Sequence, residues 1–244
     1  MIVKNIKSDN LDFKKIMIIL IHFVVFGALH AISIMNDRGW LPISGIEEFL
    51  HFSLERWLIW VLPCLVLIVS FKKDLYVNLK EMFFNKVKLK TLILCILPFL
   101  LYEIFGLMIV KYTGLGASRP LKEFASANEF LSTFLKHSWG VLVGPAIPEE
   151  MVFRAWLQNI FTGKSPSKKR ALLAIIMSNI MFVIIHLPTY FFVYNYSILQ
   201  TLGSCLVVFV LGGAFGLMFF KSKNILVPIG AHWLCDVVSF TFFG

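Results

Sequence analysis

ILQTLGSCLVVFVLGGAFGLMFF, residues 198–220, is a run without a single charged side chain. A transmembrane helix needs about 20 predominantly apolar residues, so this run is long enough to cross a bilayer. The rest of the chain has the same character, since 58% of its 244 residues are hydrophobic and only 15% are charged. A soluble domain of this size could not cover so much apolar surface. The sequence therefore predicts an all-α fold, a polytopic transmembrane helix bundle.

Seven segments of the chain meet the same criterion of length and hydrophobicity. They are 16–35, 56–71, 91–110, 139–161, 171–187, 198–220 and 225–243. Residues 129–143 are expected to form an additional short helix, because Gly144, Pro145 and Pro148 interrupt the helical pattern after it. We therefore expect seven or eight spans. Since no internal repeat or composition shift divides the chain, residues 1–244 are expected to form one domain.

The positions of the basic residues predict the orientation of these spans. The net charge of +9 would indicate a nucleic-acid partner in a soluble protein. Here 16 of the 23 basic residues fall in the N-terminal tail, in 72–90, in the connection after 161 and in 221–224. These are alternate connections, and positively charged connections stay on the cytoplasmic side. We therefore predict a multi-pass protein of the plasma membrane with a cytoplasmic N-terminus, membrane lipid around it and no nucleic-acid partner.

Several polar side chains fall inside the predicted spans. They are Glu103, Glu149, Glu150, Arg154, His186, His232 and Asp236. A charge at the bilayer centre costs at least about 2.5 kcal/mol, so each is a hypothesis for a functional site. Glu150 and Arg154 are four residues apart and can pair, whereas Glu149 points about 100° away and has no partner on its own helix. His232 and Asp236 share a helix face by the same spacing.

The depth of these groups in the membrane predicts which of them can meet. Counting about 1.5 Å per residue from each cytoplasmic end gives roughly 20 Å for both glutamates, 22 Å for His186, 18 Å for Glu103, 17 Å for Asp236 and 10 Å for His232. We expect the groups to share one cavity within the membrane, with Glu149 unpaired and aimed at His186. The alternative for each histidine is a helix–helix contact, and for Glu103 such structural support is the preferred interpretation.

These residue types are the ones that amide hydrolysis requires. A glutamate kept away from bulk water can act as a general base, and a histidine opposite it could hold the same water. A second histidine with a hydrogen-bonding neighbour could stabilise the oxyanion. A zinc ion bound by Glu149, His186 and His232 is an alternative, although the chain contains no HExxH motif. It also contains no GxSxG motif for a serine nucleophile.

Three short motifs follow one another in the second half of the chain. EEMVFR (149–154), FVIIH (182–186) and HWLCD (232–236) match the patterns EExxxR, FxxxH and HxxxN/D. In this order and spacing they resemble the CPBP family, the CAAX-protease and bacteriocin-processing endopeptidases also called Abi proteins. The motifs cover about the last 100 residues, within 139–243.

The resemblance implies an intramembrane endopeptidase that cleaves a peptide or a small membrane protein, in peptide or bacteriocin processing or in self-immunity. It implies water activation by Glu149 and His186, a supporting pair of Glu150 and Arg154, and an oxyanion site of His232 and Asp236. The last position is commonly asparagine in the prenyl-protease branch, so Asp236 must be protonated or donate through water. No metal cofactor is expected. The alternative function is a non-catalytic membrane adaptor or immunity protein that binds a partner.

Overall fold

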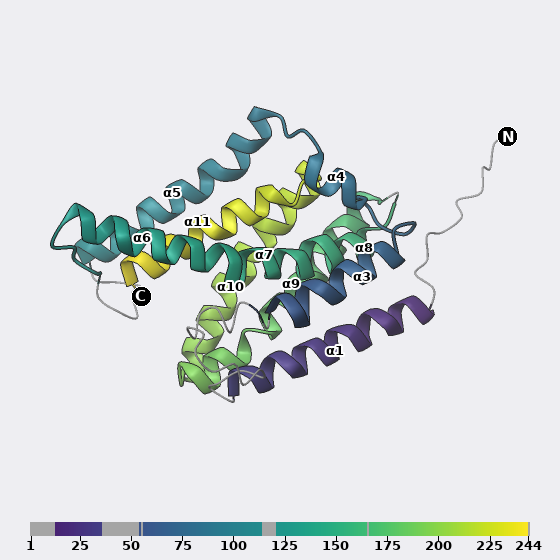
Figure 1. Cartoon of the computed structure of the whole chain (residues 1–244), viewed down its shortest axis with the longest axis horizontal. Helices are drawn as coiled ribbons and strands as arrows, with labels where there is room; N and C mark the ends of the chain where they lie inside the picture. The colour runs from purple at the N-terminus through teal and green to yellow at the C-terminus, as the bar shows by residue number, and fades with distance from the viewer. Residues whose placement is uncertain (1–12, 36–53, 55, 114–120, 165, 244) are drawn as a thin grey trace.

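The computed structural model describes residues 13–35, 54, 56–113, 121–164 and 166–243 (Figure 1). All regular structure in these ranges is helical, which confirms the predicted all-α class. The helices, with π-helical turns labelled η, are α1 Phe13–Met35, η1 Trp57–Val61, α3 Leu62–Ser70, α4 Leu79–Phe84, α5 Leu89–Thr113, α6 Ala127–Val141, η2 Leu142–Ala146, α7 Ile147–Glu150, η3 Met151–Gln158, α8 Asn159–Thr162, α9 Lys168–Ile184, η4 Thr189–Val193, α10 Ile198–Ser222 and α11 Leu226–Phe243. The start of the N-terminal tail and nearly all of the connection 36–55, between the first two predicted spans, lie outside the described residues.

Each of the seven predicted spans coincides with a helical stretch. Three helices in the described ranges are long and apolar enough to cross a membrane, namely Lys15–Ile34, Lys168–Val193 and Ile198–Ser222. Trp57–Ser70 and Leu226–Phe242 are apolar but shorter. The bundle of apolar helices is therefore confirmed, while the count of seven or eight spans stays a prediction.

A continuous helical stretch from α6 to α8 forms the centre of the molecule. The predicted interruption after residue 143 is wrong, because the helix continues through Pro145 and Pro148. Pro145 lies inside the π-helical turn η2, and Pro148 lies in the first turn of α7. In a π-helix the hydrogen bonds join residues five apart, and the widened turn accommodates a proline that has no N–H to donate. The second π-helical segment, η3, follows Glu150 directly.

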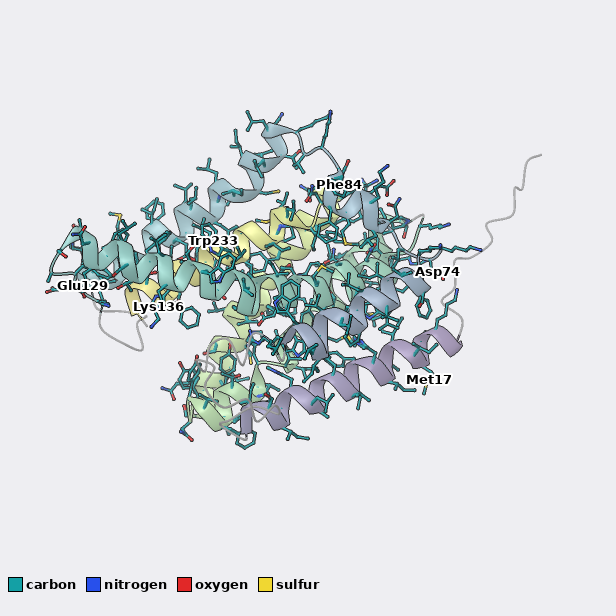
Figure 2. All side chains as sticks on the ribbon, viewed as in Figure 1. Met17, Asp74, Phe84, Glu129, Lys136 and Trp233 are labelled. Atoms are coloured by element: carbon teal, nitrogen blue, oxygen red, sulfur yellow. The ribbon has the colours of Figure 1, made fainter. Side chains whose placement is uncertain are left out.

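The neighbours of this central stretch fix the position of α7. The first half of the stretch, from α6 to α7, packs against α11, and η3 packs against α3, α9 and α10. Figure 1 shows α6 and α7 crossing the molecule beside α11, with α3 and α1 on the other side. Trp233, labelled in Figure 2, donates a 2.9 Å hydrogen bond from Nε1 to the carbonyl of Ser138 and so ties α11 to α6. Helices α7 and α11, which hold residues of the first and third motifs, are thus held side by side.

Candidate active site

Glu150 and Arg154 form an ion pair in the interior of the protein. Arg154 Nη1 lies 3.2 Å from Glu150 Oε1, with side chains 1% and 0% exposed, which confirms the pairing predicted from the spacing. Arg154 Nη2 donates to the carbonyl of Gly212 at 2.8 Å. The guanidinium also lies over the rings of Phe182 and Phe215, at 4.5 Å and 5.6 Å from their centroids. A buried cation is thereby held by an opposite charge, a carbonyl dipole and two ring faces.

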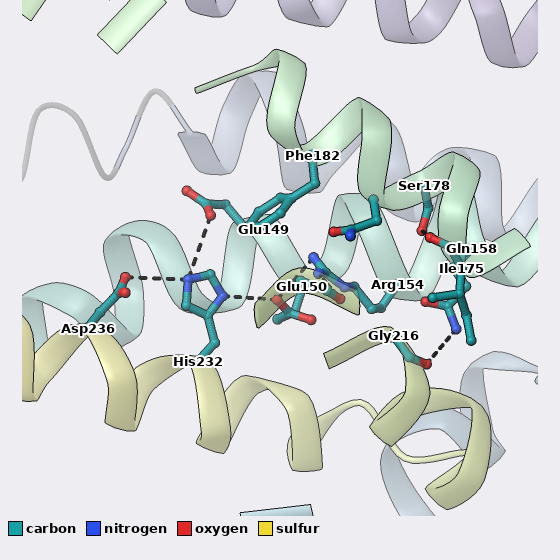
Figure 3. A network of polar contacts seen from close by, with 12 residues as sticks. Glu149, Glu150, Arg154, Gln158, Ile175, Ser178, Phe182, Gly216, His232 and Asp236 are labelled. Carbon is teal, nitrogen blue, oxygen red and sulfur yellow. Dashed lines mark hydrogen bonds and ion pairs between the residues drawn. The ribbon is translucent and has the colours of Figure 1, made fainter. Parts of the chain in front are cut away.

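His232 lies where three carboxylates meet (Figure 3). Its Nδ1 is 2.9 Å from Glu150 Oε1, and its Nε2 is 3.7 Å from Glu149 Oε2 and 3.4 Å from Asp236 Oδ2. The prediction that His232 and Asp236 share a helix face is therefore confirmed. Because ionised carboxylates only accept hydrogen bonds, the ring can donate toward both sides only when it carries two protons. If only Nδ1 carries a proton, Nε2 is an acceptor. A hydrogen bond on that side then requires a protonated Glu149 or Asp236.

Glu149 does not lack a partner, contrary to the prediction. Its side chain is buried, and its Oε1 lies 3.5 Å from Nη1 of Arg56. Its second oxygen, Oε2, faces His232. Arg56 directly precedes η1, far from Glu149 in the sequence, and η1 packs against α7. The spacing along a single helix identifies partners only within that helix, so it could not reveal this contact.

His186 borders the cluster instead of facing Glu149. Its Nδ1 lies 2.7 Å from the carbonyl oxygen of Phe182. Since a carbonyl only accepts, Nδ1 carries the proton, and Nε2 is the acceptor when the ring is neutral. The ring packs on Phe182 and Tyr190, at centroid distances of 4.8 Å and 6.1 Å. Within the described residues no hydrogen bond or ion pair joins His186 to Glu149, and the histidine that contacts Glu149 is His232.

Glu103 on α5 reaches the other edge of the cluster. Its carboxylate lies close enough to Cys235 and Asp236 to interact with both. Helix α5 packs against α11, which explains the approach. Glu103 thus lies beside the cluster, and its supporting role stays a prediction.

The ligands of the zinc alternative do not converge. Zinc sites hold three or four side chains at about 2.0–2.3 Å from one ion. Among the residues that the structure describes, no group of three or more His, Cys, Asp or Glu side chains could hold a metal ion. The three side chains Glu149, His186 and His232 are therefore not gathered around one point in this arrangement, and the zinc alternative stays a prediction.

Two glycines of α10 support the site and were not predicted. The carbonyl of Gly212 accepts from Arg154, and that of Gly216 accepts from Nε2 of Gln158 at 2.7 Å. The two donors are four residues apart on one helix, and the two glycines are four apart on the other. The signal that could have found them is the GxxxG spacing in an apolar run, which marks close helix–helix approach.

The substitution Gly212→Ala is expected to destabilise the protein by about 1–3 kcal/mol, as overpacking of a filled core does. A Cβ at this position would meet the side chains of Asn179 and Phe182, and Nη2 of Arg154 at 3.0 Å. Gly203→Ala on the same helix is the matched control, because its Cβ would meet nothing within 4 Å. Unfolding of both variants in detergent measures the difference, and equal stabilities would contradict a close contact at Gly212.

The apolar helices and the buried carboxylate–histidine cluster together define a multi-pass membrane protein with a candidate hydrolytic site. Residues 131–238 match the family described as type II CAAX prenyl endopeptidase Rce1-like. The matched family is the one that the three motifs resemble, so the match confirms that resemblance over these residues. The matched range holds the cluster apart from Arg56 and Glu103. No curated protein matches the chain. At the level of the family, the match supports an intramembrane protease.

Proposed function

We propose that this protein is an endopeptidase that hydrolyses a peptide bond within the membrane, using a water molecule activated by Glu149. The observation that supports the proposal is the convergence of Glu149, Glu150 and Asp236 on His232, between α7 and α11. Buried carboxylates are expensive inside a membrane protein, so two buried glutamates and a partly exposed aspartate around one imidazole indicate a functional site.

Glu149 serves as the general base in this proposal. One of its oxygens takes a proton from water while the water oxygen bonds to the carbonyl carbon of the substrate. The same proton then passes from Glu149 to the leaving amine as the C–N bond breaks. His186, whose Nε2 is an acceptor when the ring is neutral, orients the water from the side of Phe182.

His232 and Asp236 stabilise the oxyanion in this proposal. The oxyanion accepts a hydrogen bond from a proton that Nε2 of His232 shares with Asp236, whose Oδ2 lies 3.4 Å away. Glu150 accepts from Nδ1 and fixes the orientation of the ring, and Arg154 neutralises Glu150. Asp236 can thus support a donor although a carboxylate replaces the amide of asparagine. The proposed chemistry uses side chains alone.

The proposed substrate is a peptide or a segment of a small membrane protein. A role in peptide or bacteriocin processing or in self-immunity stays a prediction from the resemblance. The adaptor alternative predicts binding of a partner without cleavage, so a direct test of hydrolysis separates the two functions.

Hydrolysis can be tested with the purified full chain in lipid vesicles and a library of apolar peptides, in water labelled with heavy oxygen. We expect product peptides whose new carboxyl terminus carries the label, because the attacking oxygen comes from water. Mass spectrometry identifies both the cleavage site and the label. Addition of a strong chelator is expected to leave the rate unchanged. Loss of the rate with the chelator and its return with zinc would contradict the proposed chemistry, and retained partner binding without cleavage would favour the adaptor.

A further inference from the structure

Arg56 approaches the proposed base from outside the motif-bearing region. Its Nη1 lies 3.5 Å from Glu149 Oε1, and its side chain is 27% exposed. The two oxygens of Glu149 are thereby divided, since Oε1 faces Arg56 and Oε2 faces His232 at 3.7 Å. The contact fixes the rotation of the carboxylate, because turning it would bring either oxygen away from its partner.

The guanidinium of Arg56 is itself held in place by an aromatic side chain. It lies over the ring of Trp60, 5.2 Å from the centroid. Trp60 is buried and packs edge-on against Phe26 and His30 of α1, at 5.0 Å and 4.7 Å. Arginine can stack on a ring and pair with a carboxylate at once, because its charge is delocalised over a plane. Arg56 is therefore a cation of restricted position that faces Glu149.

We propose that Arg56 is a positioning residue for Glu149, which keeps the carboxylate ionised and turned toward His232 between turnovers. The inference rests on the proposed function, because it assigns Arg56 a task in preparing the general base. A neighbouring positive charge favours the ionised form of a carboxylate. Glu149 can then accept a proton from water, and the same charge helps it to release that proton to the leaving amine. Arg56 keeps its own proton throughout.

The substitutions Arg56→Gln and Arg56→Lys test this role through the pH dependence of kcat and KM. Without the cation the carboxylate takes up a proton more readily, so the acid limb of the kcat profile is expected to move up by as much as about 0.7 pH unit in Arg56→Gln. The loss of kcat is then up to about fivefold on the acid side and small on the alkaline side, with little change in KM. Arg56→Lys is expected to restore most of the acid limb, because it restores the charge.

Lys122→Gln is the matched control for the loss of the cation. Lys122 also pairs with a glutamate, at 3.8 Å from Glu129, and also lies over an aromatic ring, at 5.1 Å from that of Phe124. Its substitution is expected to leave the pH profile of the wild type. A uniform loss of activity at every pH in Arg56→Gln, with a lowered melting temperature, would overturn the proposal in favour of a structural role. A change in KM alone would also overturn it, in favour of substrate binding.

An infrared titration of the full chain separates this inference from the proposed function. The C=O band of protonated Glu149 is the band that Glu149→Gln removes, and its appearance with falling pH reports protonation without any substrate. In Arg56→Gln this band is expected at higher pH than in the wild type and in Lys122→Gln. An unchanged titration would sink the inference even if the protein cleaves peptides. Absence of cleavage by the wild type would instead overturn the proposed function.

Discussion

Replacement of Glu149 by glutamine is expected to lower the rate of peptide hydrolysis by about 10²- to 10⁴-fold, the usual contribution of a general base. The amide keeps the size and the acceptor oxygen of the side chain but cannot take a proton from water. The fold is expected to survive, because Arg56 keeps contact with solvent at 27% exposure. His232 also keeps Glu150 and Asp236 as partners. The measurement is the initial rate in lipid vesicles, at equal amounts of folded protein.

Glu129→Gln is the matched control for this experiment. It makes the same chemical change on the same continuous helical stretch, but Glu129 accepts from the backbone N–H of Ala125 at the start of α6 and pairs with Lys122. Its rate is expected to equal that of the wild type. A Glu149→Gln protein that hydrolyses peptides at the wild-type rate would remove Glu149 from the proposed chemistry.

The helices were largely predictable, because their signal is local. Twenty apolar residues in a row indicate a helix wherever they occur, and the pairs Glu150 with Arg154 and His232 with Asp236 follow from four-residue spacing. The prolines after residue 143 misled the prediction for a local reason as well. A π-helical turn accommodates a proline that would break a regular α-helix, and nothing in residue spacing alone signals such a turn.

Contacts between helices were less predictable, and Glu149 illustrates the reason. Counting residues from the membrane surface predicted His186 at the depth of Glu149 and His232 about 10 Å shallower. The structure instead places His232 at 3.7 Å from Glu149, a contact that a residue count cannot predict because the count ignores helix tilt and the offset between helices. Arg56 could not be assigned for the same reason, since its approach to Glu149 depends on the packing of η1 against α7.

Substitution of Arg154 by methionine is expected to destabilise the protein by about 3–5 kcal/mol, the cost of leaving one member of a buried ion pair without its partner. Glu150 would keep only His232 while its side chain is 0% exposed. The carbonyl of Gly212 would lose its side-chain donor. Methionine preserves much of the length of the side chain, so the effect reports the charge more than the volume.

The double substitution Glu150→Gln with Arg154→Met distinguishes the cost of leaving Glu150 without its partner from the cost of losing the other contacts of Arg154. Removing both charges avoids an uncompensated buried carboxylate, so the double variant is expected to recover most of the lost stability.

Arg56→Met is the matched control, because Arg56 also contacts a glutamate but is 27% exposed. A partly exposed pair contributes at most about 1 kcal/mol. Equilibrium unfolding of the four proteins, wild type included, provides the comparison. If Arg154→Met and Arg56→Met cost the same, burial would not decide the strength of these two Glu–Arg pairs. The division of the adjacent glutamates into a structural Glu150 and a reactive Glu149 would then lose its physical basis.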